Sequence, residues 1–342
     1  MFCLKTCRKL RYRGSVSGTF YRLSHLGQAV FLRKISADIL GKKYYSRGMY
    51  DQNPMGGRTM IRIITDSTSD LSKELLERYR VNVLPLHVSL GEAEYRDGVD
   101  IAPDQLYAWS DANKTTPKTS APSLEDAVEL FRPILQAGDE IIAFSISSSM
   151  STSFNCMRLA AEELEASDRI TVVDSASLST GIGLLVLEAA QMAEKGFSRQ
   201  QIAEEMERLK PLVRTSFVVD TLTYLYRGGR CSGVAALAGG VLKLHPCIRV
   251  ENGAMVVGKK YRGKYDKIVL DYVKDMEEAI LSAKSERIFI THSGIDQAVI
   301  DSVKAYLEQL NRFREIHVTR AGSVISSHCG YGTLGVLFLA QE

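Results

Sequence analysis

The chain has 342 residues, of which 45% are apolar and 24% are charged, and its net charge at pH 7 is +3. These proportions are typical of a globular protein with room for two domains, and they exclude a disordered chain. No apolar run is long enough to cross a membrane, because the best, Gly181–Ala193, contains Glu188 and Gln191. We therefore expect no stable membrane insertion.

The net charge hides two different segments. Residues 1–59 contain 12 Lys and Arg but only two acids, Asp38 and Asp51, a net charge of +10, whereas the remainder carries −7. This segment lacks the apolar core of a secretory signal. It could resemble a transit peptide or a nucleic-acid-binding arm. We favour a third interpretation: residues 1–59 lie outside the fold and outside the native protein, which begins at Met60, and no nucleic acid is a partner.

Cysteine and histidine patterns argue against disulfides and metals. The six cysteines are scattered with no C-x-x-C pair, which favours reduced thiols in a cytoplasmic protein. The six histidines form no H-x-x-x-H pattern and no cluster with cysteine. We expect neither a metal site nor a cofactor.

From Met60 to residue 212, strand and helix signals alternate, which predicts an N-terminal α/β domain with a parallel sheet and flanking helices. Expected strands are Ile61–Thr65, Val81–Leu90, Ile141–Ser145 and Ile170–Asp174. Expected helices are Ser69–Arg80, one capped by Ser123 and kinked or shortened by Pro133, Phe154–Ala166, and the amphipathic pair Ser179–Glu194 and Ser198–Lys210.

Residues 213–342 predict a second α/β domain with a mixed sheet. The hairpin signal Glu251–Ala254 joins two apolar runs of this region. Expected strands are Thr215–Asp220, Cys247–Val250, Met255–Val257, Ile288–His292 and Ile316–Thr319; expected helices are Tyr265–Ala283 and Gln297–Leu310.

Two hydroxyl-rich loops are the strongest functional signal. One is Thr119–Ser123, and the other, Ser147–Ser153, follows the expected strand Ile141–Ser145. Hydroxyls donate hydrogen bonds to an anion without carrying charge themselves. Two such loops at the carboxyl ends of parallel strands would form a neutral cup for a carboxylate or phosphate.

Conventional catalytic motifs do not compete with this interpretation. Gly330–Gly335 matches G-x-G-x-x-G, but no βαβ unit follows it, so close backbone packing explains it better than a dinucleotide. The chain contains neither a P-loop nor a G-x-S-x-G elbow. A serine hydrolase remains the enzyme alternative, with Ser151 as nucleophile, His328 as base, and Asp66 or Asp174 as the acid. A regulator that binds a carbohydrate or phosphate is a third possibility.

From Met60 onward the chain resembles the DegV family, the fatty-acid-binding subunits of bacterial fatty acid kinase. The resemblance rests on several motifs in one order: Thr65–Asp70, Asp97-Gly98, Lys118–Ser123, Ser147–Ser153, Val173–Ser175, Tyr224–Arg230 and His328–Gly332.

The resemblance implies two α/β domains that hold a long-chain fatty acid in an apolar tunnel. It implies that Thr119 and Ser151 bind the carboxylate and that His328 lies beside them. It further implies a non-enzymatic carrier, which presents the carboxylate to a separate ATP-dependent kinase subunit that makes the acyl phosphate for phospholipid synthesis. Arg227, Arg230 and Arg262 are then candidate contacts for that partner or for phosphate.

The sequence also departs from the family pattern. Ser151-Thr152-Ser153 stands where Ser-Gly-Thr is usual, so the loop backbone is expected to differ. Ala121 replaces a common glutamine, Tyr331 a common proline, and His245-Pro246 a usual Lys-Pro. These changes bear on chain-length preference and on the identity of the kinase partner.

Overall fold

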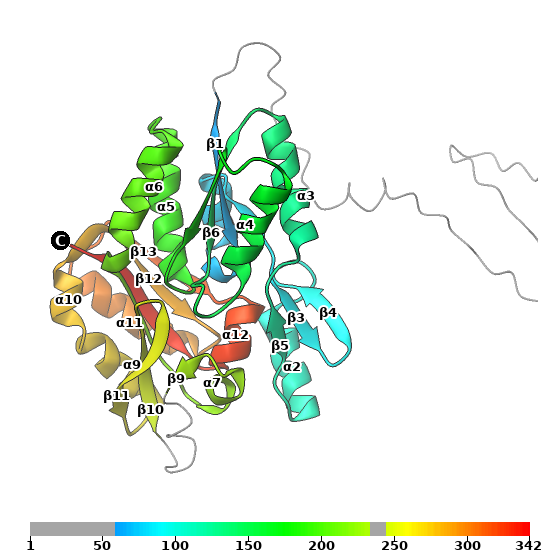
Figure 1. Ribbon diagram of the computed structural model, residues 1–342. Helices are drawn as coiled ribbons and strands as arrows, with labels where there is room; N and C mark the ends of the chain where they lie inside the picture. Colours follow the sequence, from blue (N-terminus) through cyan, green and yellow to red (C-terminus); the bar gives the residue numbers. More distant parts are fainter. Residues whose placement is uncertain (1–58, 233–243) are drawn as a thin grey trace, which may run out of the picture. The chain divides into compact units, whose positions relative to one another are not determined.

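The structure is a computed structural model that describes residues 59–232 and 244–342. The predicted basic extension, residues 1–59, therefore lies outside the described residues apart from Thr59. Within the described part, the strands β1 to β14 form three sheets, and helices pack against them (Figure 1).

The first sheet is parallel, with strand order β2-β1-β6-β7. Its strands are β1 (Ile61–Asp66), β2 (Asn82–Leu84), β6 (Glu140–Ser145) and β7 (Ile170–Asp174). Successive side chains alternate between its two buried faces. Ile64 and Ile141 pack with α3 (Leu124–Gln136) and α4 (Ser153–Glu163), whereas Ile63 and Phe144 face the opposite core.

The opposite face is covered by α5 (Thr180–Glu194) and α6 (Arg199–Leu209). Every residue from Thr180 to Leu187 is buried, because α5 also packs against strands of the seven-stranded sheet. The expected amphipathic character is thus wrong for the first half of α5. A helix that is apolar all round is a buried one, and here it lies between two sheets.

A small antiparallel sheet, of order β4-β3-β5, was not predicted. It consists of β3 (His87–Leu90), β4 (Ala93–Arg96) and β5 (Lys118–Ser120), with α2 (Pro103–Asn113) between β4 and β5. Its own small core contains Val88, Leu106 and Val324. The strands have only three or four residues each, which is too short for a clear sequence period.

The largest sheet is mixed, with strand order β13-β12-β14-β8-β10-β11-β9. Its strands are β8 (Val213–Val218), β9 (Cys231–Ser232), β10 (His245–Glu251), β11 (Ala254–Tyr261), β12 (Ala283–His292), β13 (Glu315–Arg320) and β14 (Leu334–Ala340). Ile288, Ile290 and Val336 share a core with α9 (Tyr265–Lys274) and α11 (Gln297–Gln309). The remaining elements are η1 (Ser67–Ser69), α1 (Lys73–Arg78), η2 (Lys210–Leu212), α7 (Thr223–Gly228), α10 (Glu277–Leu281) and α12 (Ser323–Cys329).

Two expected elements are divided and one begins later than expected. The strand expected over Val81–Leu90 splits into β2 and β3 at Pro85, which has no N–H for a sheet ladder. The helix expected from Ser69 begins only at Lys73, because Asp70 adopts the left-handed conformation and Ser72 caps α1. The helix expected over Tyr265–Ala283 breaks into α9 and α10, and Ala283 already belongs to β12.

The predicted fold class is confirmed. The chain has an α/β fold with a parallel sheet in its N-terminal part and a mixed sheet in its C-terminal part. One apolar cluster joins Ile63 and Phe144 of the first sheet to Phe217 and Leu337 of the other, and the described residues form one compact unit. The division into domains 60–212 and 213–342 stays a prediction.

Candidate functional site

Thr119 is placed by the small antiparallel sheet. The prediction that Thr119 lies in a loop at the carboxyl end of a parallel strand is wrong: it is the middle residue of β5 and pairs directly with Val88 of the antiparallel neighbour β3. Directly paired residues point to the same face of a sheet. Val88 is fully buried in the core that also contains Val324 of α12, so Thr119 faces α12 while Lys118 and Ser120 face away.

The start of α12 is fixed by two buried carboxylates. Asp70 Oδ1 accepts a hydrogen bond of 2.7 Å from Gly322 N, and Asp97 Oδ1 accepts one of 2.6 Å from Ser323 N. These bonds satisfy backbone donors that the helix itself leaves free. Burial raises the pKa of both carboxyls, against the opposing effect of these hydrogen bonds. The register of α12, and hence the place of His328 near its end, depends on these anchors.

His328 contacts Thr119 across a sequence separation of 209 residues. Its Nε2 lies 2.8 Å from Thr119 Oγ1. Burial, and then the positive charge of Arg230, lower the pKa of His328 to about 4, so the ring is neutral at pH 7. Its Nδ1 is buried and has no hydrogen-bond partner among the described residues.

The geometry indicates which ring nitrogen carries the proton. A neutral imidazole has one N–H and one lone pair. A proton on Nε2 is satisfied by Thr119 Oγ1, whereas a proton on Nδ1 would be a buried donor without a partner, which is rare and costly. We therefore place the proton on Nε2. The hydroxyl proton of Thr119 is then free to bind an acceptor, such as an anion.

The end of α7 lies against the imidazole. A Cβ at Gly228 would come within 2.4 Å of His328 Nδ1, so only glycine leaves room for this ring. Gly229 follows with φ of 66° and ends the helix. The motif Tyr224–Arg230 thus contains the end of α7. Arg227 and Arg230 are exposed, as is Arg262 beyond β11.

Ser151 lies in the loop between β6 and α4. Its hydroxyl is 2.9 Å from Ser153 Oγ and accepts a hydrogen bond from Ser153 N. Thr152 has φ of −86°, a conformation open to any residue, so this position does not require the glycine of the family pattern. The loop is anchored at Ser147, whose Oγ donates to Gly253 O over 2.6 Å.

Only two of the three predicted site residues are in direct contact within the described part of the chain. Thr119 and His328 form a direct contact, whereas no hydrogen bond in the described part of the chain joins Ser151 to either residue. A hydrolytic triad needs a bond between nucleophile and base. His328 Nε2 is bound to Thr119 instead, which disfavours the Ser151–His328 alternative.

A buried carboxylate connects the strand ends near these loops. Asp66 is the last residue of β1 and accepts hydrogen bonds from Ile146 N at 2.8 Å and from the Thr68 backbone and hydroxyl. Burial raises its pKa to about 6, against these hydrogen bonds. Since β1 and β6 are parallel neighbours, Asp66 fixes the position where the serine loop leaves β6. The sequence placed Asp66 and Asp70 in the motif Thr65–Asp70 and named Asp66 only as a candidate acid of the hydrolytic triad, whereas in the structure both carboxylates hold backbone N–H groups.

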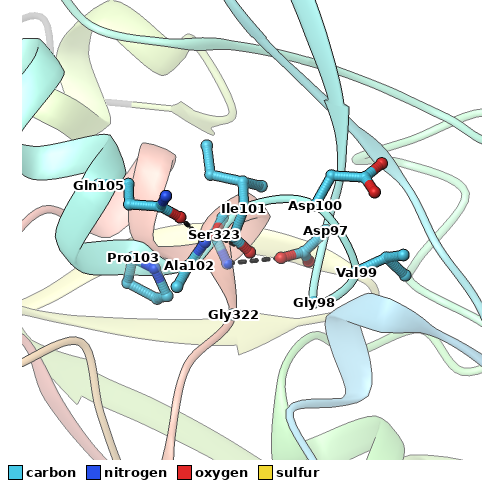
Figure 2. A pocket seen from close by; sticks show the side chains of 10 residues that line it. All are labelled: Asp97, Gly98, Val99, Asp100, Ile101, Ala102, Pro103, Gln105, Gly322 and Ser323. Carbon is cyan, nitrogen blue, oxygen red and sulfur yellow. Dashed lines mark hydrogen bonds between the residues drawn. The ribbon is translucent and has the colours of Figure 1, made fainter.

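A cavity of about 310 Å³ lies between residues 97–105 and the start of α12. Figure 2 shows Asp97 at its wall, bonded to the backbone of Ser323. Neither Thr119, Ser151 nor His328 lines this cavity, so it is not the predicted tunnel.

The described residues show neither a metal-binding cluster nor a membrane-spanning helix. Residues 59–232 and 244–342 contain no cluster of three or more His, Cys, Asp or Glu that could hold a metal ion. Within the same ranges, no helix has the length and apolar character needed to cross a membrane.

Comparisons with known proteins place most of the chain in one family. The sequence profile of the DegV family, described as one of uncharacterised proteins, matches residues 60–341. A DegV domain-containing protein of Deinococcus radiodurans is 34% identical over 276 residues, which cover 81% of this chain and 97% of that protein.

Solved structures agree with the sequence match. A DegV family protein from Thermus thermophilus, described as binding fatty acid, has a TM-score of 0.74 and 33% identity, and covers 83% of this chain and 100% of its own. A stearic acid-binding protein from Eubacterium ventriosum has a TM-score of 0.73 and 30% identity, over 82% of this chain and 98% of its own.

Proposed function

The chain belongs to the DegV family, and from this premise we propose that it binds one long-chain fatty acid in an apolar tunnel. Thr119 and Ser151 donate hydrogen bonds to the carboxylate, and His328 fixes the Thr119 hydroxyl for this role. The observation that carries the proposal is the half-buried contact between Thr119 Oγ1 and His328 Nε2. Its tautomer leaves the hydroxyl proton available to an anion.

The acyl chain and the carboxylate of a fatty acid need different surroundings in a protein. Burying each CH₂ of an acyl chain contributes about 0.8 kcal/mol, so the hydrocarbon supplies most of the affinity. A carboxylate cannot be buried without donors, and charge-assisted hydrogen bonds offset the loss of water. The positive end of the α4 helix dipole lies beside Ser151 and favours an anion there, because no acidic residue in the first turn of α4 competes with it.

The proposed carrier performs no chemistry itself. It presents the carboxylate to a separate ATP-dependent kinase subunit, which makes the acyl phosphate that feeds phospholipid synthesis. Exposed Arg227, Arg230 and Arg262 are the proposed contacts for that partner or for the phosphate. Because the proposed kinase partner uses ATP, the proposal also implies a cytoplasmic protein.

Mass spectrometry of lipid extracted from the purified protein tests the ligand. We expect about one fatty acid per chain, with an acyl length that fits the tunnel. A protein that carries none, and that also refuses added stearic acid, would refute the proposal. A kinase subunit with ATP should convert the bound acid to acyl phosphate, which tests the partner separately.

A further inference from the structure

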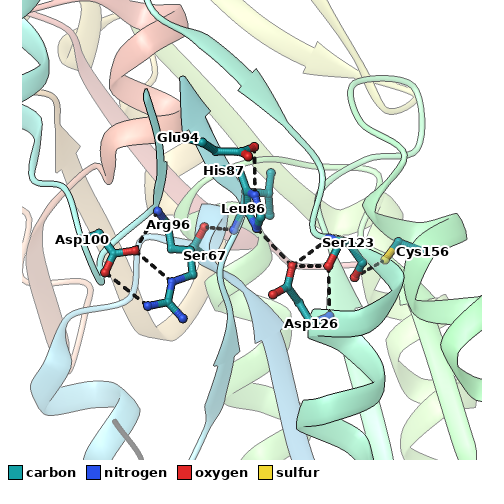
Figure 3. A network of polar contacts seen from close by, with 9 residues as sticks. All are labelled: Ser67, Leu86, His87, Glu94, Arg96, Asp100, Ser123, Asp126 and Cys156. Atoms are coloured by element: carbon teal, nitrogen blue, oxygen red, sulfur yellow. Dashed lines mark hydrogen bonds and ion pairs between the residues drawn. The ribbon is translucent and has the colours of Figure 1, made fainter. Parts of the chain in front are cut away.

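The face of the small sheet opposite Thr119 has its own polar cluster. Its centre is His87 of β3, whose Nδ1 lies 3.0 Å from Glu94 Oε1 and whose Nε2 lies 3.1 Å from Asp126 Oδ2. Figure 3 shows the imidazole between the two carboxylates, one from β4 and one from α3. The ring is only 17% exposed.

Only a doubly protonated ring can donate a hydrogen bond to both carboxylates at once. A carboxylate oxygen only accepts hydrogen bonds, so each of the two contacts needs an N–H. A neutral imidazole has a single N–H and would direct a lone pair at the other carboxylate. The imidazolium satisfies both contacts and carries the opposite charge.

The same carboxylate oxygen fixes the end of the Thr119 segment. Asp126 Oδ2 also accepts hydrogen bonds from Ser123 N at 3.0 Å and Ser123 Oγ at 2.5 Å. Ser123 caps α3 in return by accepting from Asp126 N. Burial alone would raise the pKa of Asp126. The hydrogen bonds from Ser123 and His87 outweigh this effect, so the net pKa is lowered. These contacts therefore favour the ionised form of the Asp126 carboxyl.

The other end of the segment depends on β3 as well. His87 pairs with Ser120, and Val88 pairs with Thr119. His87 is thus attached to the Thr119–Ser123 segment at both ends, by the backbone ladder at Ser120 and by the shared carboxylate at Ser123.

The charged and titratable groups around His87 are few. Glu94 comes from β4, as does Arg96, which pairs with Asp100. Asp126 comes from α3, and Cys156 of α4 donates to Ser123 O. Lys118 of β5 belongs to the same sheet and pairs with Ser89.

We propose that His87 is a positioning residue for the fatty acid site, which as an imidazolium holds the Thr119–Ser123 segment in its binding conformation. This inference rests on the proposed function. Raising the pH removes one ring proton and with it one of the two carboxylate contacts. The segment then loosens at Ser123, and the Thr119 hydroxyl is less well placed for the carboxylate.

The test compares stearic acid affinity of full-length wild type and His87→Gln between pH 5.5 and 8.5. The ratio of the two affinities cancels the titration of the acid itself. We expect wild type to bind about fivefold more tightly at the acidic end and the advantage to shrink towards pH 8.5. The control is His317→Gln, because His317 also contacts a carboxylate, Glu315, and is 19% exposed. Its ratio to wild type should not change with pH.

NMR of the histidine ring nitrogens tests the bridge without any ligand. We expect both ring nitrogens of His87 to carry hydrogen-bonded protons at pH 6, and Glu94→Gln, whose amide oxygen is a weaker acceptor than a carboxylate, to weaken the hydrogen bond at Nδ1. A singly protonated ring at pH 6, or an affinity ratio that is flat with pH, would overturn the proposal. Failure of wild type to bind stearic acid at any pH, with the bridge intact by NMR, would instead refute the proposed function.

Discussion

At the scale of residues, the proposed site depends on the contact between Thr119 and His328 and on the space around that contact. Thr119 and His328 are ordinary polar residues in sequence, and the motifs that contain them predicted a shared anion site. The structure adds the reason for their pairing, since burial keeps His328 neutral and its Nε2–H orients the hydroxyl. It also adds Gly228, whose missing side chain makes room for the ring.

Removing both proposed carboxylate donors should weaken binding strongly. We expect Thr119→Ala combined with Ser151→Ala to lower stearic acid affinity about 100-fold, because two hydrogen bonds to a charged group contribute ~3 kcal/mol together. Calorimetric titration measures the change. The exposed pair Thr115→Ala and Ser167→Ala loses the same hydroxyls elsewhere and should bind like wild type. Equal affinity of the two double variants would contradict the assignment of the carboxylate site.

A methyl group at Gly228 should displace His328. The added Cβ would lie 2.4 Å from Nδ1, so we expect Gly228→Ala to break the contact with Thr119 and to reduce stability by about 1–3 kcal/mol. Fatty acid affinity should fall as well. Gly229→Ala is the comparison, because it strains a backbone with φ of 66° but meets no atom within 4 Å. If Gly228→Ala keeps wild-type affinity, His328 does not orient Thr119.

At the scale of elements, buried carboxylates determine how the loops and helices of the site are held. Asp66 fixes the start of the serine loop, and Asp70 and Asp97 fix the start of α12. These carboxylates accept hydrogen bonds from backbone N–H groups that secondary structure leaves unpaired. The short strands β3 and β5 then set which face Thr119 presents. Sequence periodicity predicts neither these carboxylate anchors nor the face that Thr119 presents, because the elements are short and their partners are far away in the chain.

The burial of Asp66 should appear as a pH dependence of stability. Its pKa is about 6 in the folded protein, whereas an exposed aspartate has a pKa of 3.8. The folded state therefore holds the proton more tightly, and stability decreases as pH rises from about 4 to 6, by ~3 kcal/mol in total. Urea unfolding at pH 4.5 and 7 measures this against Asp66→Asn, in which other titrations cancel. The variant should be less destabilised, relative to wild type, at pH 7; an equal deficit at both pH values would contradict the assignment.

At the scale of the whole molecule, α5 is the central element. It lies between the parallel sheet and the mixed sheet, and its first half is buried on all sides. The apolar cluster that joins both sheets passes through it. Loosening either sheet should therefore affect the other, although the hydroxyl loops come from the N-terminal half and His328 from the C-terminal half.

A chain that begins at Met60 should fold and bind like the full chain. The family profile begins at residue 60, and the compact unit begins at residue 58. We expect the thermal midpoints of the two chains to agree within about 2 °C, because a 1 kcal/mol change in a domain of this size shifts the midpoint by a few degrees. Scanning calorimetry of both proteins tests this. A large loss of stability in the shorter chain would assign residues 1–59 a role in the fold.

The sequence by itself determined the α/β class, the order of most strands and helices, the family resemblance, and Thr119, Ser151 and His328 as site candidates. These depend on local periodicity and on motifs, which the chain carries within a few residues. The tertiary structure decided the features that depend on distant partners. It split the strand at Pro85, built the small sheet behind Thr119, and enclosed α5 between two sheets. It also placed the proton of His328, because only the folded chain shows which ring nitrogen has a partner.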